Sequence, residues 1–424
     1  MDRNKFVQCP CCWHRFPLSE TLWIAMHHDL KDDYLVDALG DKMAQQRFLP
    51  VRFTPGCRAF DERGERCGRD FACPHCHVAI PESYFNCEPM YVSIVGTTGA
   101  GKTFFLASLH HRLRQNPFKR DFGLEGLSYD SALYASQNRI LDENVNTLFR
   151  AVAPPDTFVT LDRTAVGDHV QSVLFPEGKS WVALPFTYVL TVDGKKRALC
   201  LYDRQGGAFT QRGGIGNARH VFNLHLLDSD ILFFLYDPTQ NGSCVLDYAP
   251  KYGRSIYRDG QIDEAALVGV ESRILNPDIE LSSHHVFGAV ANFVRQYSNP
   301  NNGLIKEDRY TKYICIIATK CDAWERCLPD KTQQYLREPP KDDVYGVIAH
   351  VSNDVEAWIE KHDPAFTAAV RGFAKNYNYI PVSAAGRQVI KNAKEEEGYN
   401  IGVEPLSPRW IDVPFLRALY PPQS

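Results

Sequence analysis

Residues 91–103, YVSIVGTTGAGKT, join three kinds of local structure in one short stretch. The first half is rich in β-branched and aromatic side chains, which is typical of a buried strand. Gly96, Gly99 and Gly101 then open the backbone, and from Lys102 onward large apolar residues recur at helical spacing. The sequence therefore predicts a strand, a glycine-rich turn and a helix in immediate succession.

The spacing G-x-x-x-x-G-K-T is that of a P-loop, whose backbone N–H groups curl around a phosphate at a helix N-terminus. We expect Lys102 to reach the β- and γ-phosphate oxygens and the Thr103 hydroxyl to hold Mg²⁺. The alternative, a chance glycine turn, is disfavoured because a strand and a helix flank it. The predicted phosphate-binding residues are Gly96, Thr97, Thr98, Gly99, Ala100, Gly101, Lys102 and Thr103.

The composition of the 424-residue chain is that of an ordinary globular protein with room for two or three domains. It is 44% hydrophobic and 23% charged, and its formal net charge of -4 gives no electrostatic case for a nucleic-acid partner. The longest apolar strand candidate, residues 231–236, is far too short to span a bilayer. Because the N-terminus also lacks the apolar core of a signal peptide, we expect a cytoplasmic protein.

Eight of the thirteen cysteines precede the P-loop, which indicates metal binding rather than disulfides. Cys9 with Cys12, and Cys73 with Cys76, form two C-x-x-C pairs, each with proline after the first cysteine. Zinc ribbons present four thiolates in this way. We therefore predict a zinc ribbon in residues 1–88.

The stretch between the two cysteine pairs is longer than in a compact zinc ribbon. We predict a polar helical segment over residues 19–43. Cys57 and Cys67 either complete a second zinc site with neighbouring cysteine or histidine residues, or remain buried free thiols. A redox role for the C-x-x-C pairs is the weaker alternative because no βαβ pattern surrounds them.

Beyond the P-loop helix, residues 131–150 predict another helix, and a threonine-rich segment follows. P-loop switch proteins carry a threonine there that meets Mg²⁺ and the γ-phosphate. Thr157, Thr160 and Thr164 are the candidates, and we take Thr157 as the leading one. Spacing alone does not choose among the three.

Residues 184–203 predict a hairpin, because Asp193-Gly194 lies between two alternating apolar runs. This hairpin would add an antiparallel edge strand to an otherwise parallel sheet. Asp203 ends its second strand and begins a D-x-x-G motif with Gly206. The aspartate can hold a Mg²⁺-bound water, and the glycine N–H can meet a γ-phosphate, so the following loop can reorder when that phosphate leaves.

A second pair of motifs concerns the base. The buried strand predicted at residues 313–319 leads into Lys320 and Asp322, whose carboxylate can accept from both N1–H and the 2-amino group of guanine. The alternative is a surface lysine and aspartate beside a strand. A later strand, residues 379–382, ends in Ser383 and Ala384, which lie where a backbone N–H would contact guanine O6. The predicted base-contacting residues are Thr319, Lys320, Asp322, Ser383 and Ala384.

The ordered set GTTGAGKT, DRQG, TKCD and SA resembles the Ras-like GTPase superfamily, in the branch related to translation factors. The resemblance implies a P-loop NTPase domain in residues 89–424: a three-layer α/β/α fold with a mostly parallel sheet and one antiparallel edge strand. It also implies GTP/GDP and Mg²⁺ as cofactors. The added cysteine-rich N-terminus resembles the double-GTPase proteins of bacterial conflict or defence systems.

One residue departs from this resemblance. Ras-like enzymes often carry a water-orienting glutamine directly after D-x-x-G, and here that position is Gly207. We therefore expect weak intrinsic GTP hydrolysis. Arg204, Gln205 and Arg212 are the candidates for positioning water or stabilising charge, alongside Lys102.

These motifs together predict a GTP-operated switch that regulates a protein partner. The zinc ribbon, the switch loops and an insertion at about residues 240–284 are the segments expected to meet that partner. Two alternatives are a nucleotide-bound scaffold without turnover and an ATP-dependent phosphotransferase using the same P-loop.

Overall fold

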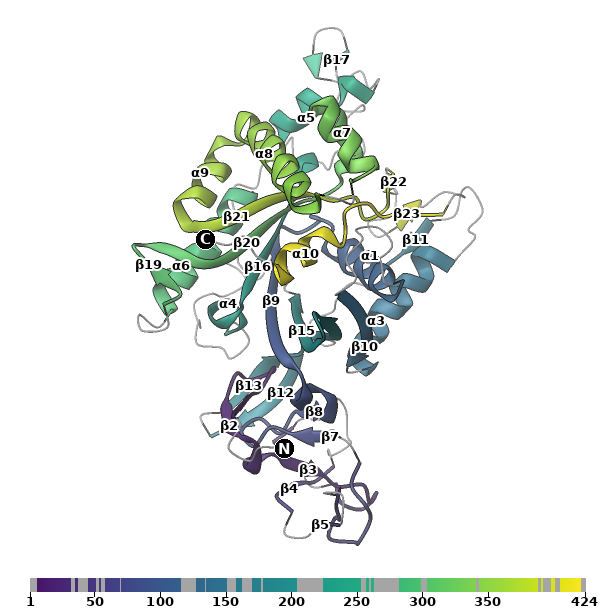
Figure 1. Ribbon diagram of the computed structural model, residues 1–424, viewed down its shortest axis with the longest axis vertical. Coiled ribbons are helices and arrows are strands. Elements are labelled where there is room, and N and C mark those ends of the chain that lie inside the picture. The colour runs from purple at the N-terminus through teal and green to yellow at the C-terminus, as the bar shows by residue number, and fades with distance from the viewer. Residues whose placement is uncertain are drawn as a thin grey trace.

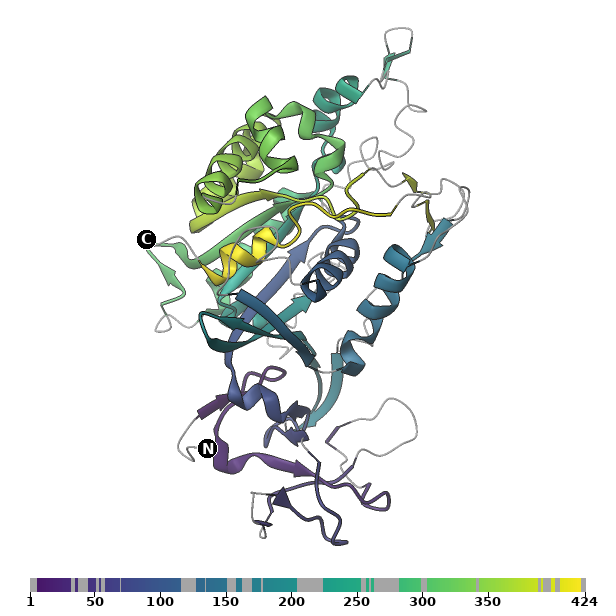
Figure 2. The ribbon, with the colours of Figure 1, turned by 45° about the vertical axis from the view of Figure 1, so that its right-hand side comes forward.

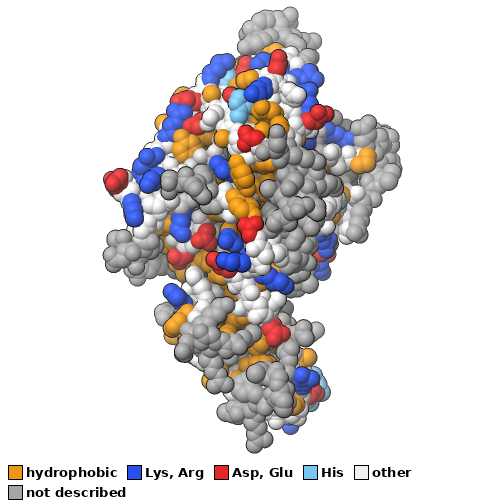
Figure 3. Space-filling view, in the orientation of Figure 1, with side chains coloured by type: hydrophobic (Ala, Val, Ile, Leu, Met, Phe, Trp, Pro, Cys, Tyr) orange, Lys and Arg blue, Asp and Glu red, His pale blue; other side chains and the backbone are white. Residues whose placement is uncertain are grey.

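The structure is a computed structural model of an elongated molecule, with the cysteine-rich module at its narrow end (Figure 1, Figure 2). A space-filling view shows positive and negative side chains interspersed over the visible face (Figure 3). The structure describes residues 6–31, 35–36, 45–50, 53–54, 58–68, 70–115, 127–133, 135–150, 158–161, 170–176, 178–203, 224–252, 257–258, 261–262, 282–298, 303–340, 343–387, 390–391, 398–400 and 405–420.

In this described part of the chain, the main sheet has eight strands in the order β10-β14-β15-β9-β16-β20-β19, with β21 also paired to β20. Strands β15, β9, β16, β20 and β21 are parallel, whereas β14 runs antiparallel to β15. The predicted fold class, an α/β fold with a mostly parallel sheet and one antiparallel edge strand, is confirmed; β10 extends the sheet beyond the antiparallel β14, and β19 pairs antiparallel with β20 at the other edge. The strands are β9 Glu88–Gly96, β10 Leu127–Leu133, β14 Phe186–Val192, β15 Lys195–Asp203, β16 Ile231–Tyr236, β19 Ile305–Lys306, β20 Arg309–Ala318 and β21 Ala374–Pro381.

The predicted hairpin is β14 and β15, and its turn has the backbone that the sequence requires. Asp193 and Gly194 have φ values of 48° and 78°, the left-handed pair that matches the twist of a two-residue hairpin. Val192 and Lys195 are directly paired at the turn. The aspartate–glycine pair therefore sets the register of both strands.

Strand β10 was not predicted. Its residues 131–133 were assigned to a helix over 131–150, but they pair with β14 on its outer side, and helix α3 spans only Ala135–Val145. This start of the predicted helix was wrong because pairing with an exposed strand edge outweighed the local helical pattern. Residues 146–150 continue α3 as one turn of π-helix.

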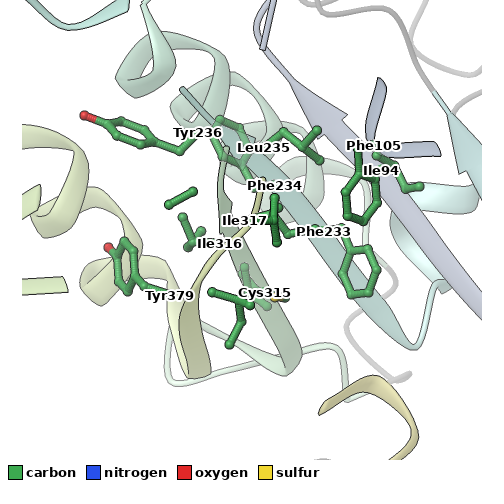
Figure 4. Packing of buried hydrophobic residues seen from close by; sticks show 14 of the residues in the cluster. Ile94, Phe105, Phe233, Phe234, Leu235, Tyr236, Cys315, Ile316, Ile317 and Tyr379 are labelled. Carbon is green, nitrogen blue, oxygen red and sulfur yellow. The ribbon is translucent and has the colours of Figure 1, made fainter. Parts of the chain in front are cut away.

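Two adjacent phenylalanines of β16 show how the layers form, since successive side chains on a strand point to opposite faces. Phe233 packs edge-on against Phe105 of α1 (Lys102–Arg114), with ring centroids 6.5 Å apart (Figure 4). It also packs against Phe415 of α10 (Val413–Leu419) at 5.5 Å. Helices α1 and α10 therefore cover one face of the sheet.

Phe234 points to the other face. Its ring lies 5.2 Å from Phe287 of α6 (Ser283–Tyr297) and 5.5 Å from Phe366 of α9 (Pro364–Phe373). Both side chains are buried. The sheet is thus sandwiched between two helical layers.

Further described helices pack around this sandwich. The additional helices are α4 His225–Asp228, α5 Gly242–Tyr248, α7 Asp330–Arg337 and α8 Val344–His362. None of the described helices is both long enough and apolar enough to cross a membrane.

The N-terminal module contains a small sheet of order β4-β3-β7-β8. The helix predicted over residues 19–43 was wrong in its described part, because Leu22–Ile24 is strand β3. Trp23 pairs with Phe71 across the strands, with rings edge-on at 4.6 Å, and this packing favours strand. The other strands of the module are β1 Phe6–Gln8, β2 Arg15–Pro17, β4 Arg47–Phe48, β5 Phe53–Thr54, β6 Arg58–Ala59, β7 Asp70–Ala72 and β8 Ala79–Pro81.

The module shares one apolar cluster with the main domain, so the two parts pack against each other in addition to being joined by the chain. The cluster includes Val173 and Val182 of the hairpin β12 (Val170–Phe175) and β13 (Gly178–Ala183), as well as Tyr202 of β15. The Tyr202 hydroxyl donates to the Pro10 carbonyl at 2.5 Å. This contact joins the first cysteine pair to the main sheet.

Part of the predicted insertion near residues 240–284 lies toward the end of the molecule opposite the cysteine-rich module. It contains α5 and a short hairpin, β17 Tyr257–Arg258 with β18 Gln261–Ile262 (Figure 1). The remaining short strands are β11 Phe158–Thr160, β22 Ile390–Lys391 and β23 Gly398–Asn400, which form a separate sheet.

Candidate nucleotide and metal sites

The phosphate loop lies between the end of β9 and the start of α1. Gly99 and Gly101 have φ values of 79° and 88°, a conformation that glycine adopts without strain. A Cβ at Gly96 would lie 2.7 Å from the Leu235 carbonyl oxygen of the neighbouring strand. All three glycines of the motif therefore have a structural reason, and the predicted strand, turn and helix are present.

Lys102 curls over this loop. Its Nζ donates to the carbonyl oxygens of Gly96 at 3.0 Å and Thr97 at 3.1 Å. Burial lowers the pKa of the amine, and the carboxylate of Asp203 opposes that shift. To contact a phosphate, the amine exchanges these carbonyls for phosphate oxygens, which bear more negative charge.

Asp203 ends β15 and lies opposite Ile94 of β9 in the parallel register, two residues before Gly96. The strand pairing therefore brings it beside the phosphate loop, where its predicted Mg²⁺ role requires it. Thr103 is the second residue of α1 and is partly exposed. The other predicted switch and catalytic residues, Thr157, Arg204, Gln205, Gly206 and Arg212, lie outside the described residues and stay predictions.

The predicted base loop follows β20. Thr319 donates its N–H to the Tyr236 carbonyl at 2.9 Å, and Lys320 takes a left-handed backbone with φ 55°. Two residues on, the Asp322 carboxylate accepts a hydrogen bond from the Ser383 hydroxyl. Burial raises the pKa of Asp322, and the Ser383 bond partly counteracts it.

Ser383 orients the carboxylate rather than offering its N–H to a ligand. Its N–H donates to the Arg409 carbonyl at 3.0 Å, and its hydroxyl accepts from Gly386 N–H at 2.8 Å. Of the two residues predicted to offer an N–H to guanine O6, Ala384 is thus the remaining candidate. The Ala384 carbonyl accepts from the Ser108 hydroxyl of α1 at 2.7 Å, which ties this loop to the P-loop helix.

A segment that sequence reasoning missed connects the two loops. Asp237, directly after β16, is buried and accepts from Lys320 Nζ at 2.6 Å. Its other oxygen accepts from both the N–H and the hydroxyl of Thr239, at 2.9 and 2.7 Å. A carboxylate that is itself fixed by Thr239 therefore holds the Lys320 amine in place.

Gln240 completes the connection on the phosphate side. Its Oε1 accepts from the Thr97 hydroxyl at 3.1 Å, and its Nε2 donates to the Thr98 carbonyl at 3.1 Å. A polar run, DPTQ, at the carboxyl end of a central apolar strand was the available signal, because ligands bind at that edge of parallel sheets.

The four cysteines of the two C-x-x-C pairs come together in the N-terminal module. Their sulfur atoms all lie within 4.8 Å of one another, and all four side chains are buried. Cys9 and Cys76 sulfurs are 3.8 Å apart, and those of Cys12 and Cys73 are 3.7 Å apart. Tetrahedral zinc with bonds of about 2.3 Å places its sulfurs about 3.8 Å apart. The cluster therefore fits a zinc ribbon.

The backbone makes equivalent N–H···S hydrogen bonds at the two cysteine pairs. Cys11 N–H donates to Cys9 Sγ at 3.3 Å, and His75 N–H donates to Cys73 Sγ at 3.4 Å. Burial and the neighbouring thiols raise the pKa of Cys76, a cost that a divalent cation offsets when it binds thiolates.

The second predicted zinc site is not assembled by the described residues. Cys67 is buried, and burial together with Asp61 raises its pKa to about 11. It belongs to neither of the metal-ligating groups in the described part of the chain. Cys57 lies outside the described residues, so a site that uses it stays a prediction.

No protein-family model matches the chain, and no curated protein matches it. Solved structures with distant similarity include sup35 complexed with GDP and the GTPase-like domain of S. cerevisiae Ski7 bound to GTP. Each is 10% identical over 72% of this chain, with TM-scores of 0.24 and 0.23. The chain covers 40% and 45% of those two chains, so it spans less than half of their length.

Proposed function

We propose that this protein is a GTP-binding switch with weak intrinsic GTP hydrolysis. One observation supports it above the others: the glycine loop and the loop that carries Lys320 and Asp322 lie at the same edge of the sheet. Asp237 bonds Lys320, and Gln240 bonds the glycine loop, so the segment 237–240 links the two. The glycine loop can bind the phosphates of a guanine nucleotide, and the Asp322 carboxylate can accept from N1–H and the 2-amino group of its base.

In this proposal each residue has a separate task. The loop from Gly96 to Gly101 offers backbone N–H groups, and Lys102 neutralises the phosphates. Thr103 and Asp203 hold Mg²⁺, directly and through water. Arg204, Gln205 and Arg212 assist hydrolysis in place of the glutamine replaced by Gly207.

The cysteine cluster serves as a structural zinc site, because four buried protein ligands leave no position for a substrate. The zinc ribbon, the switch loops and the 240–284 insertion are the proposed partner-facing segments. The setting we propose, from the resemblance of the cysteine-rich N-terminus alone, is a bacterial conflict or defence system.

The base assignment is tested by equilibrium titration with fluorescent GTP, ATP and XTP. Asp322→Asn replaces a carboxylate acceptor with an amide that can donate to the 2-oxo group of xanthine. We expect wild type to prefer GTP and the variant to lose GTP affinity and gain XTP affinity. A wild-type preference for ATP would overturn the switch proposal and favour the phosphotransferase.

Turnover is tested separately by phosphate release from GTP. Lys102→Ala removes the charge that faces the phosphates, so we expect release to fall to background. Equal release by wild type and variant, with GTP still bound, would instead indicate the scaffold without turnover.

A further inference from the structure

The N-terminal module carries a second group of metal-ligating side chains on a loop after β3. The loop is closed by a hydrogen bond from Leu30 N–H to the His27 carbonyl at 3.1 Å. Both of its ends are fixed to Gln46, through Ala25 N–H at 2.9 Å and the Leu30 carbonyl at 2.9 Å. The positions of residues 27–29 are therefore set by backbone pairing.

A buried aspartate fixes this loop against a neighbouring one. One oxygen of Asp61 accepts the N–H groups of Met26 and His27, at 3.1 and 2.9 Å. The other accepts those of Arg63 and Glu65, at 3.0 and 2.9 Å. Burial alone would raise the pKa of Asp61, but these four bonds hold it below its ordinary value. The carboxylate thus holds His27 and Glu65 side by side.

Three ligand atoms converge on this loop. His27, His28 and Asp29 offer atoms within 4.8 Å of one another. His27 Nδ1 lies 3.7 Å from Asp29 Oδ2, and His28 Nε2 lies 3.1 Å from Asp29 Oδ1. The ligand atoms of a tetrahedral ion with bonds of about 2.1 Å lie about 3.4 Å apart, which small rotations of the exposed His28 and Asp29 side chains around the half-buried His27 can reach.

Glu65 supplies the outer carboxylate of such a site. Its Oε1 lies 4.0 Å from His27 Nε2, the ring nitrogen on the far side from Asp29. Metal-ligating histidines usually donate their other ring N–H to a carboxylate, which orients the imidazole and strengthens it as a ligand. Nδ1 now accepts the Asp29 N–H at 3.2 Å, so a metal on this nitrogen replaces that bond, and Glu65 then has to move closer to Nε2 to accept its N–H.

We propose that His27, His28 and Asp29 form a second metal site, oriented by Glu65 and separate from the four-cysteine cluster. Two imidazoles and one carboxylate select a borderline divalent ion such as Zn²⁺ or Ni²⁺ over Mg²⁺ or Ca²⁺. With three protein ligands, the site leaves a position for water or for a side chain from another protein. It binds more weakly than the buried thiolate cluster, because two of its three ligands, His28 and Asp29, are exposed.

The test is equilibrium dialysis of the full chain against buffered free Zn²⁺, followed by elemental analysis. We expect wild type to take up one equivalent more zinc than His28→Ala or Asp29→Asn at micromolar free zinc. Glu65→Gln should keep that equivalent but bind it about 10-fold more weakly. Comparing variants makes the result independent of any zinc bound through Cys57 or Cys67.

The matched control is His284→Ala, which removes one of two adjacent histidines in α6 whose rings lie 5.3 Å apart. It should leave zinc uptake unchanged. Equal zinc uptake by wild type, His28→Ala and Asp29→Asn, each folded by circular dichroism, would overturn the proposal. So would an equal loss in the His284→Ala control, because that would show binding to histidine pairs in general.

Discussion

The Nζ atom of Lys320 lies 2.6 Å from Oδ2 of Asp237, whose side chain is fully buried while that of Lys320 is 40% exposed. The pair therefore has one fixed end and one end facing the proposed base position. Since Asp237 also accepts two bonds from Thr239, its carboxylate has little freedom to follow the lysine. Lys320 is positioned by Asp237.

Replacing Asp237 with asparagine should weaken both folding and nucleotide binding. The neutral amide cannot balance Lys320, and its NH2 group must face either the Lys320 ammonium or the Thr239 donors, which are themselves donors. We expect a loss of about 1–3 kcal/mol in the free energy of unfolding. GTP affinity should fall about 10-fold. Urea denaturation and GTP titration measure the two effects.

The control for that variant is Glu360→Gln, which breaks an exposed ion pair with Arg371. Exposed pairs contribute little to stability because water and salt screen them. The control should match wild type in both measurements. An Asp237→Asn protein that also matched wild type would show that the ion pair positions nothing.

Gln240 and Thr97 should be energetically coupled. Gln240→Ala and Thr97→Val each remove one side of a 3.1 Å hydrogen bond, and either change should reduce GDP affinity by about 3- to 10-fold. Because both act on the same contact, the double variant should lose less than the sum of the two effects. Strict additivity in a double-mutant cycle would contradict the bridge between the loops.

GTP binding should fall on acidification at a higher pH than an ordinary aspartate allows. Burial raises the pKa of Asp322, and guanine needs the ionised carboxylate. Affinity is therefore complete above the raised pKa and is lost as pH falls through it. Without nucleotide, the free energy of unfolding should instead increase as pH falls. The folded-state pKa of Asp322 is raised, so its ionised form destabilises the fold, and protonation removes that effect.

Ser383→Ala makes this prediction sharper. The Ser383 hydroxyl bond lowers the pKa of Asp322, so its removal should move the midpoint of the GTP-affinity profile to higher pH. Asp322→Asn should show no such midpoint. Titrations of all three proteins between pH 4 and 8 decide the matter, and an unchanged midpoint in Ser383→Ala would exclude this role for the serine.

The sequence was most informative where local chemistry is strict. The glycines of the P-loop, the Asp193-Gly194 turn and the apolar run of β16 each allow few conformations, and each element lies where predicted. The helix predictions for two regions were wrong for a common reason. Residues 22–24 and 131–133 have ambiguous local patterns, and pairing with distant strands decided their structure.

The residues of the candidate site also fall into those that the sequence could predict and those that it could not. Motif residues such as Lys102 and Asp322 could be predicted because they stand at fixed spacing within short sequence motifs. Asp237 and Gln240 act through other residues, so their role follows from three-dimensional proximity and has no spacing of its own. The cysteine cluster was predictable because two short C-x-x-C turns each fix a pair of sulfurs.

Cys73→Ser should remove zinc from the four-cysteine cluster and unfold the N-terminal module. Four ligands hold a structural zinc, and loss of one leaves a buried site that cannot be completed. We expect a fall in zinc content and a lower melting temperature. Cys67→Ala, which changes a buried cysteine outside the cluster, should keep that zinc. A metal-free wild-type protein that is fully folded would refute the zinc ribbon.

Tyr202→Phe tests whether the cysteine-rich module stabilises the strand that ends at Asp203. The variant removes the hydroxyl that donates to Pro10, between the first cysteine pair, and leaves the ring in its packing against Trp13 at 5.4 Å. We expect a loss of about 1 kcal/mol in the free energy of unfolding, because the Pro10 carbonyl loses its donor. In a Cys73→Ser background the module no longer holds Pro10 in place, so the same change should have little effect. A Tyr202→Phe effect of equal size in both backgrounds would mean that the tyrosine stabilises β15 without any contribution from the zinc-bound module.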